Sequence, residues 1–436
     1  MAVRIISREI IKPSSSTPNH LKIHKLSLMD QMASYSYLPI LLFYSGPCKN
    51  SDHLKKSLSQ ILTHYYTFAG QVKDHSFIEC NDYGVSFIEA HVATKMSEVL
   101  HQQPQLDLLE KLLPCQSEEM VTNQVNLAIQ VNYFECGGVA ISLVFKHSVA
   151  DGTAAAHFVK NWAAVACGGT GNDINKDHDL IFDSTSILPP IDCLGSSSTT
   201  KEMPKPISIE TTTKRFIFDG SKIAALQDKI GNRPTRFEAV SALLWGTAVR
   251  DAQREEEEDG FTTTTTTTQF EALITVNLRK KMNPPIPEQC IGNIHTWKTT
   301  DWPMEETINY SSLARKLHES VNMINDEYVR KGNASDSIFS CIGNFLEKDI
   351  KLKPFFITSW CRLPFYKADF GWGKPILLTT TMRFDKGAIL LDTCDGDGIE
   401  AWVTLPKEDM IKFQKHPDIL GIHLLFRLRF LFRERK

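Results

Sequence analysis

The sequence predicts a two-domain α/β protein. Its 436 residues exceed what one hydrophobic core usually serves, which is at most about 250–300 residues. Residues 127–145 alternate apolar and polar as in a β-hairpin, and the residues after Gly152 carry an apolar stripe at helical spacing. A stretch rich in Ser, Thr and Pro at 184–213 separates the two halves. We therefore expect an N-terminal domain at 1–183, a crossover linker at 184–213 and a C-terminal domain at 214–436.

Composition excludes several classes of protein. The chain is 42% hydrophobic and 23% charged, with a net charge of −3, which argues against a dedicated nucleic-acid binder but leaves room for a local basic pocket. Its ten Cys form no C-x-x-C pair and no cluster with zinc-ligand spacing. No apolar leader or membrane-spanning run is present in the sequence. We expect a cytoplasmic monomer with reduced thiols and no metal.

The first half contains a helix, a hairpin and a second helix. Apolar residues at helical spacing, from Leu54 to Tyr65, predict a helix over 53–65. Two alternating strands follow, Leu127–Tyr133 and Val139–Phe145, joined by a turn at Cys136–Gly138. A helix is then expected from Gly152 through Trp162.

The second half starts with a short strand at Phe216–Phe218 and a helix near Ser221–Lys229. Thr235 and Glu238 are spaced as a capping box that opens a helix through Trp245.

Two segments have unusual composition. We interpret the acidic run Glu255–Asp259 and the Thr run Thr262–Thr268 as an exposed loop without function. The tail, Leu420–Lys436, interleaves Leu and Phe with Arg. We expect it to pack on the C-terminal domain or trail from it, and a membrane-surface segment is the alternative.

The segment His147–Gly152 holds the first candidate catalytic residues. His147 follows a strand and precedes a helix, and its unperturbed pKa near neutrality suits a general base. A core histidine at a strand end is the alternative. Asp151 is four residues later, so a His–Asp dyad is a second hypothesis. A nucleophilic Ser148 is disfavoured because the sequence has no G-x-S-x-G elbow.

A second motif, Asp369-Phe370-Gly371-Trp372-Gly373, stands in the other half of the chain. Together the two motifs resemble the H-x-x-x-D-G and D-F-G-W-G signatures of the BAHD family of plant acyl-CoA-dependent acyltransferases. The resemblance covers nearly the whole sequence. Further family-like segments are Ile11–Ser15, Leu26–Gln31, Thr275–Arg279 and Thr358–Arg362, and those most like the vinorine-synthase-like branch are Phe134–Gly138 and Met282–Pro285.

This resemblance implies the fold and the catalytic roles. It implies two chloramphenicol-acetyltransferase-like domains with mixed sheets and an active-site channel between them. His147 would be the general base that takes the acceptor's hydroxyl proton, without a covalent acyl-enzyme. Asp151 would point away from the substrate and pair with Arg279, in a structural role.

The resemblance also assigns the oxyanion of the tetrahedral intermediate to Thr358 and Trp360, both neutral donors. Core packing is the alternative for Trp360. The motif Asp369, Phe370, Gly371, Trp372 and Gly373 is expected to be structural.

The CoA phosphates need cations or a helix N-terminus. Thr235 and Arg236, at a predicted helix start, are the candidates by position and by family analogy, and Lys374 is a weaker one. Plain capping by Thr235 and exposed charge at Arg236 and Lys374 are the alternatives.

The predicted function is O-acylation of a plant specialised metabolite. The partners would be acyl-CoA, with acetyl-CoA as the leading donor, and an alkaloid-like alcohol. Nucleic acid is not expected as a partner. An acyl-sugar acyltransferase using short branched acyl-CoAs, or a catalytically idle binding protein on this scaffold, are the alternatives. Thr67 and Gln71 replace a Pro and an Arg that are frequent in the family, and we expect this departure to reshape the N-terminal domain locally while leaving the reaction intact.

Overall fold

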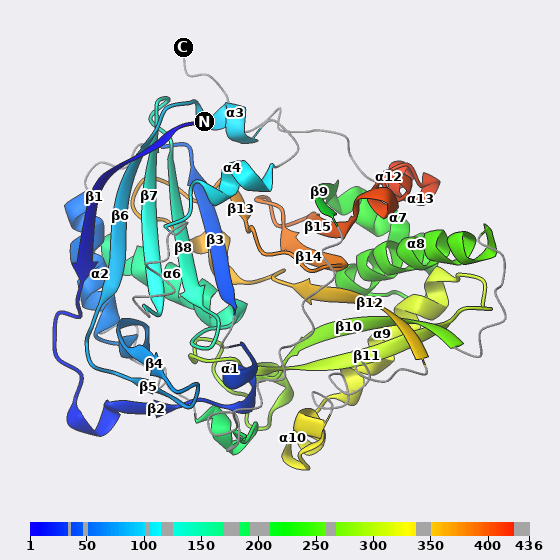
Figure 1. The fold of residues 1–436 in the computed structure, drawn as a ribbon, viewed down its shortest axis with the longest axis horizontal. Helices are drawn as coiled ribbons and strands as arrows, with labels where there is room; N and C mark the ends of the chain where they lie inside the picture. The colour runs from blue at the N-terminus through cyan, green and yellow to red at the C-terminus, as the bar shows by residue number, and fades with distance from the viewer. Residues whose placement is uncertain are drawn as a thin grey trace.

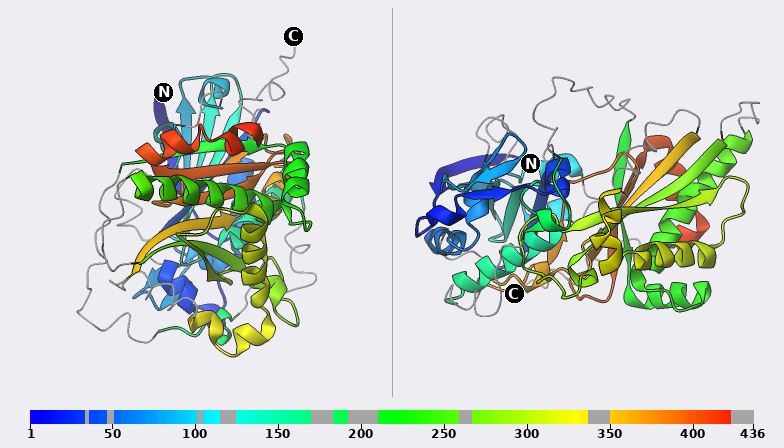
Figure 2. Two further views of the ribbon diagram at one scale, coloured as in Figure 1. Left: turned by 90° about the vertical axis from the view of Figure 1, so that its right-hand side faces the viewer. Right: turned by 90° about the horizontal axis from the view of Figure 1, so that it is seen from below.

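Two mixed β-sheets, each with its own helices, form the two halves of the protein and lie side by side along its longest axis (Figures 1 and 2). The computed structural model describes residues 1–33, 36–46, 51–100, 105–114, 125–169, 183–191, 210–258, 267–336 and 350–422. The α/β class and the two-sheet architecture expected from the sequence are confirmed.

The first sheet has the strand order β1-β6-β7-β8-β3-β13. Its strands pair antiparallel except for β6 with β7, which are parallel. The predicted hairpin is present as β7 and β8, in a register that pairs Leu127 with Phe145. The six strands are β1 (Val3–Ile11), β3 (Tyr37–Tyr44), β6 (Val85–Val92), β7 (Leu127–Phe134), β8 (Val139–Lys146) and β13 (Leu377–Thr379).

Helices α2 (Ser51–Leu62) and α6 (Gly152–Ala166) pack against each other and cover one face of this sheet (Figure 1). Both helices were predicted. Asp151 caps α6, because its Oδ1 accepts a hydrogen bond of 2.8 Å from the Ala154 backbone N–H. The short elements beside this sheet are η1 (Asn19–Leu21), β2 (Ile23–Lys25), α1 (Leu28–Met32), η3 (Tyr66–Ala69), β4 (Gln71–Lys73), β5 (Phe77–Glu79), α3 (Met96–Leu100), α4 (Leu106–Glu110) and η5 (Ser184–Ser186).

The second sheet has the strand order β11-β10-β12-β14-β15-β9, and β10, β12 and β14 run parallel. Helices α7, α8, α12 and α13 lie on its outer side (Figure 2, left). The strands are β9 (Thr211–Phe218), β10 (Thr267–Asn277), β11 (His295–Pro303), β12 (Ile350–Ser359), β14 (Gly387–Asp392) and β15 (Ile399–Pro406). The helices are α7 (Gly220–Ile230), α8 (Arg236–Glu258), η6 (Arg279–Lys281), α9 (Tyr310–Met323), α10 (Asp326–Arg330), η7 (Pro364–Lys367), α12 (Lys407–Phe413) and α13 (Pro417–Ile422).

The two halves are not divided at a single point in the sequence. Strand β13 comes from the C-terminal half but pairs with β3 in the first sheet, where Leu378 lies opposite Leu42. In return, Leu28 and Met29 of α1 pack into the core of the second sheet. The division of the chain into domains at residues 183 and 213 therefore stays a proposal.

Three segments differ from the sequence-based expectation. Thr211–Thr213, expected in the linker, begin β9 and pair with β15, because the β-branched Thr favours a strand once it has a partner. Glu255–Glu258, expected in a loop, continue α8, in keeping with the high helix propensity of Glu. Thr267 and Thr268 begin β10. Residues 192–209, 259–266 and 423–436, which include most of the basic tail, lie outside the described residues.

The hydrophobic cores of the two sheets meet near β12 and β14. Ile389, Leu391 and Trp402 of the second sheet belong to the core of the first, together with Trp360. Within the described residues, no helix has the length and hydropathy that crossing a membrane requires.

Candidate active site

His147 lies directly after β8, where the two sheets meet. Its backbone N–H donates to the Ser36 carbonyl at 3.0 Å, and its carbonyl accepts 2.6 Å from the Asn293 side chain. The His147 side chain is partly buried. Its Nδ1 atom is fully buried and has no well-formed hydrogen bond to the described residues. Burial, and next the neighbouring His295, lower the pKa of His147. A neutral imidazole is the form that can accept a proton.

The Asp151 carboxylate pairs with Arg279. Arg279 Nη1 donates to Asp151 Oδ2 at 2.6 Å, and Nη2 donates to Oδ1 at 3.2 Å. The backbone N–H of Ile294 adds a third contact, 3.1 Å from Oδ2. Burial alone would raise the pKa of Asp151, but Arg279 and then His295 outweigh it and hold that pKa well below its usual range. The carboxylate is thus an anchor for the His147 loop.

The guanidinium of Arg279 is itself fully buried. Its Nη2 also donates to the carbonyls of Cys290 and Gly292, at 2.8 and 3.3 Å. Asn277 accepts from the Arg279 backbone N–H and donates to Thr153 of α6 at 3.1 Å. Strand β10 and helix α6 are thereby joined at the site.

Asn293 forms a second link between the halves. Its backbone N–H and its side-chain Nδ2 both donate to Asp30 Oδ1 at 2.8 Å. Asp30 in turn closes a capping box with Ser27 at the start of α1. The side chain that holds the His147 carbonyl is therefore itself held by a buried carboxylate from the N-terminus.

Trp360 follows β12 and lies against the start of α6. A Cβ placed on Gly152 would be 3.1 Å from Trp360 Nε1 and 3.3 Å from Cδ1. The glycine after Asp151 is therefore needed for this close approach. Thr358, two residues earlier, is partly exposed, whereas Trp360 is 4% exposed. The structure brings His147, Asp151, Arg279 and Trp360 to one place.

The segment Asp369–Gly373 packs elsewhere, beside the C-terminal end of α6. Asp369 Oδ1 accepts from the backbone N–H groups of Gly371 and Gly373, at 2.8 and 2.9 Å. Both glycines have positive φ, 96° and 108°, which other residues rarely adopt. Phe370 makes an edge contact with Trp162, at a centroid distance of 4.8 Å. The segment, which comes from the C-terminal half of the chain, therefore packs on α6 and forms a joint between the halves.

Of the three candidates for CoA binding, Thr235 and Arg236 lie at the start of α8, whereas Lys374 lies beside Gly373. Thr235 caps α8: its Oγ1 accepts from the Glu238 N–H at 3.2 Å, and the Glu238 carboxylate accepts from the Thr235 N–H at 2.7 Å. The Arg236 guanidinium donates to the carbonyls of Gly396 and Gly398, at 2.9 and 2.7 Å, so it holds the β14–β15 turn. Lys374 is exposed beside the Asp369–Gly373 joint. No contact within the described residues joins Lys374 to the other two.

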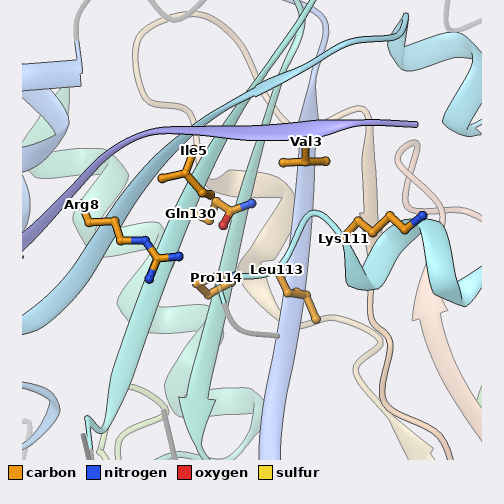
Figure 3. A pocket seen from close by; sticks show the side chains of 7 residues that line it. All are labelled: Val3, Ile5, Arg8, Lys111, Leu113, Pro114 and Gln130. Carbon is orange, nitrogen blue, oxygen red and sulfur yellow. The ribbon is translucent and has the colours of Figure 1, made fainter. Parts of the chain in front are cut away.

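A cavity of about 400 Å³ opens on the first sheet, away from His147 (Figure 3). Its lining side chains come from β1, β7 and the residues after α4. They are Val3, Ile5, Arg8, Lys111, Leu113, Pro114 and Gln130. None of them belongs to the group formed by His147, Asp151, Arg279 and Trp360, so we place the candidate active site at that group of side chains and not at this cavity. No group of three His, Cys, Asp or Glu side chains in the described part of the chain is arranged to hold a metal ion.

Sequence reasoning missed four polar residues of the site: Asp30, His157, Asn293 and His295. His157, one turn along α6 from Thr153, lies 3.8 Å from Glu288. Burial and Lys160 lower the pKa of His157 to about 4. Asp30 stood within a quoted family-like segment, but nothing in its neighbours pointed to Asn293, 263 residues away.

Comparison with known proteins identifies the family. The chain is 46% identical to Epi-neemfruitin B synthase L1AT of Melia azedarach, over 97% of this chain and 98% of that protein. It is 44% identical to a limonoid 21-O-acetyltransferase of Citrus sinensis, over the same shares. Vinorine synthase of Rauvolfia serpentina is 33% identical over 93% of this chain and 94% of its own.

The crystal structure of vinorine synthase superposes with a TM-score of 0.81 at 30% identity, covering 97% of this chain and 98% of that one. The sequence model of the Transferase family matches residues 1–420. The chain therefore belongs to the Transferase family, the BAHD acyltransferases that its two motifs resemble.

Proposed function

We propose that this protein transfers an acetyl group from acetyl-CoA to a hydroxyl of a limonoid, with His147 as general base. The observation that carries the proposal is the double hydrogen bond between Arg279 and Asp151. This pair engages the Asp151 carboxylate as a structural anchor. The lowered pKa of His147 keeps its imidazole neutral at the end of β8. A His–Asp dyad, the other hypothesis from the sequence, has no support in this arrangement.

The proposed chemistry is direct attack. The acceptor oxygen attacks the thioester carbonyl carbon while its proton passes to His147. Because Nδ1 is enclosed, Nε2 is the nitrogen that receives the proton. The tetrahedral intermediate then collapses, the C–S bond breaks, and the CoA thiolate takes the proton from His147. A general base of this kind contributes about 10²–10⁴-fold in rate.

Trp360 and Thr358 would donate to the oxyanion of that intermediate. The Trp360 Nε1 atom lies beside Gly152, one residue from the anchor Asp151. One oxyanion donor contributes about 10²–10³-fold in turnover. Neutral donors suit a neutral alcohol acceptor, since they present no cation to be desolvated.

Thr235 is the stronger of the proposed CoA contacts, because it caps the N-terminus of α8, a 23-residue helix. Arg236 would act indirectly, by holding the β14–β15 turn against that helix start. Lys374 stays a proposal for a peripheral contact at the exposed joint.

A limonoid acceptor is favoured over an alkaloid by the comparisons. The relatives named for limonoid acetylation are 43–46% identical, against 32–33% for those named for alkaloids. The branch-level expectation of an alkaloid-like acceptor is thus the second candidate. Acyl sugars and an idle binding role are weaker candidates, the latter because His147, the Asp151–Arg279 pair and Trp360 are all present near one another.

One face of the second sheet carries aromatic side chains that suit an apolar polycyclic acceptor. Ile274 and Ile357 are paired neighbours that point into the core on the α8 side, so Thr275 and Thr358 face the other way. Trp297 lies opposite Thr275 on this second face and is partly exposed. Phe356, two residues before Thr358, stacks on Phe384 at 5.3 Å. We propose that Trp297 and Phe356, which the strand registers place on this face, form an aromatic surface that contacts the ring system of the acceptor.

The test is the release of free thiol from acetyl-CoA by the purified full chain, with a panel of limonoid, alkaloid and sugar alcohols. We expect turnover with a limonoid alcohol at a kcat/KM at least about tenfold above the others, about 1.4 kcal/mol in transition-state binding. A preference for alkaloid or sugar alcohols would overturn the acceptor assignment. No thiol release with any alcohol would overturn the enzymatic function. The cytoplasmic location and the monomeric state stay predictions.

A further inference from the structure

A chain of hydrogen bonds leads from Asp30, near the N-terminus, to His147. Asp30 is 1% exposed and Asn293 is fully buried. Asp30 Oδ1 accepts hydrogen bonds of 2.8 Å from the backbone N–H of Asn293 and from its side-chain Nδ2. The same Nδ2 also donates to the His147 carbonyl at 2.6 Å. The Asp30 carboxylate therefore acts on the His147 loop through the side chain of Asn293.

The Asp30 carboxylate is itself held in one orientation. Its Oδ2 accepts from the Ser27 backbone N–H at 2.9 Å and from Ser27 Oγ at 2.7 Å. On the other side, Gly292 has a φ of 100°, which other residues rarely adopt, and the next N–H, that of Asn293, points to Asp30. A Cβ placed on Gly292 would lie 3.7 Å from Asp30 Oδ1. Each oxygen of the carboxylate thus has its own donors.

These contacts decide which way the Asn293 amide points. The carboxylate of Asp30 and the carbonyl of His147 both accept hydrogen bonds, so the NH₂ group of Asn293, with its two N–H donors, must face them. A flipped amide would set Oδ1 against two oxygen atoms and lose both hydrogen bonds. Asn293 Oδ1 is therefore the atom left to face other groups, and it is buried without a well-formed partner among the described residues.

The Nδ1 atom of His147 is the complementary group. It is the ring nitrogen nearer to the backbone of its own residue, whose carbonyl Asn293 binds, and it too is buried without a well-formed partner among those residues. Burial and then His295 lower the pKa of His147, whereas the backbone of His147 and the Asn293 side chain raise it as hydrogen-bond partners, which is the effect of acceptor oxygens. Oxygen atoms beside Nδ1 favour the tautomer in which Nδ1 carries the hydrogen.

We propose that Asp30 is a positioning residue of the catalytic centre: by holding Nδ2 of Asn293, it directs Oδ1 of this amide toward Nδ1 of His147 and selects the tautomer whose Nε2 is free to take the acceptor's proton. The inference rests on the proposed role of His147 as general base. Without the carboxylate, the Asn293 amide is able to flip, to present an N–H to Nδ1 and to favour the tautomer with its hydrogen on Nε2. That tautomer has no lone pair on Nε2 to receive a proton from the hydroxyl.

The first test is Asp30→Asn, with Gln31→Ala as the matched control. An amide at position 30 nearly keeps the volume but offers an N–H to Asn293, so it permits the flip. For Asp30→Asn we expect kcat to fall at least about tenfold, and at most by the roughly 10²–10⁴-fold that the base contributes, with the KM values for acetyl-CoA and the alcohol within about twofold.

The control variant loosens the same helix without touching Asp30. Gln31 is buried in α1 and bonds the backbone of Ile191 through both its Oε1 and its Nε2. We expect Gln31→Ala to lower the melting temperature and to keep kcat within about twofold of wild type. An equal loss of kcat in the two variants would show a merely structural role and overturn the proposal. So would a kcat of Asp30→Asn within about threefold of wild type.

The second measurement reads the tautomer directly in the wild-type protein, so it does not depend on a variant folding. In the full chain labelled with ¹⁵N-histidine, the His147 ring signals are assigned by their loss in His147→Ala and report which nitrogen carries the hydrogen. We expect the hydrogen on Nδ1 in the neutral ring of the wild type, and a shift toward Nε2 in Asp30→Asn. A hydrogen on Nε2 in the wild type would overturn the proposal. Failure of the proposed function is a separate result, since it would appear as normal turnover in His147→Ala.

Discussion

Arg279 and Asp151 are 128 residues apart in sequence and form a buried bidentate pair, with Nη1–Oδ2 at 2.6 Å and Nη2–Oδ1 at 3.2 Å. The pair joins the first turn of α6 to the end of β10, and so joins the two halves of the chain. Each partner neutralises the other, with the Arg279 side chain fully buried and the Asp151 side chain 8% exposed. The His147 loop is held to the second half of the chain by this pair together with the contacts that Ile294 and Asn293 make to Asp151 and to the His147 carbonyl.

The pair should behave as one unit in mutagenesis. Asp151→Asn and Arg279→Ala should each lower the free energy of unfolding by about 3–5 kcal/mol, because each leaves a buried partner uncompensated. The double variant should lose much less than the sum. Urea unfolding of the four proteins in a double-mutant cycle measures this coupling, and additive losses would show that the contact carries no energy.

Gly152→Ala should impair turnover more than stability. The added Cβ would lie 3.1 Å from Trp360 Nε1, so the indole must shift by a few tenths of an ångström. We expect kcat to fall about tenfold, while the stability changes by less than about 1 kcal/mol because Ala favours the helix. Gly421→Ala is the matched control, since no atom lies within 4 Å of its added Cβ. Unchanged kcat in Gly152→Ala would remove the support for Trp360 as an oxyanion donor.

His157 should make the protein less stable in acid. Its pKa is lowered to about 4 in the folded protein from 6.5. The unfolded chain therefore binds this proton first as the pH falls below 6.5, and stability is lost between that pH and about 4. His157→Gln should flatten this loss by about 2 kcal/mol while leaving stability at pH 7.5 nearly unchanged. Urea unfolding at pH 7.5 and at pH 5 tests it, and an equal loss in both proteins would contradict the assignment.

Trp297→Ala should weaken the binding of the acceptor and leave the binding of acetyl-CoA unchanged. Removing the indole from the aromatic surface should raise the KM for the limonoid alcohol about tenfold and leave the KM for acetyl-CoA unchanged. Lys298→Ala is the control on the same strand, because Lys298 lies over the Tyr328 ring at 5.7 Å. Equal changes in both KM values would place Trp297 outside the acceptor surface.

The sequence predicts the structure that depends on neighbouring residues and little of the structure that depends on residues far apart in the chain. Alternation in β7 and β8 predicts the hairpin, and so the position of His147 at a strand end, because period-two patterning is a property of neighbouring residues. The pairing of Asp151 with Arg279 came only from the family resemblance. Asn293 and His295 could not be found, since their roles depend on the packing of β10 and β11 against the His147 loop.

The dependence on distant partners also explains where the expected elements differ from the structure. The Thr run at 211–213 becomes strand because β15 is available to pair with it, and the crossing of β13 into the first sheet leaves no signal in its three residues. The contacts of the Arg236 guanidinium with the carbonyls of a turn 160 residues later likewise leave no signal in the sequence around residue 236. Long-range partners decide each of these cases.

The most direct test of the account is the turnover of His147→Ala with acetyl-CoA and a limonoid alcohol, measured at saturating substrate and neutral pH beside the wild-type enzyme. The variant removes a partly buried ring outside the cores, so its melting temperature should change little. We predict that kcat falls by about 10²–10⁴-fold. A folded His147→Ala enzyme whose kcat stays within about threefold of wild type, with chemistry limiting the rate, would contradict the assignment of the base.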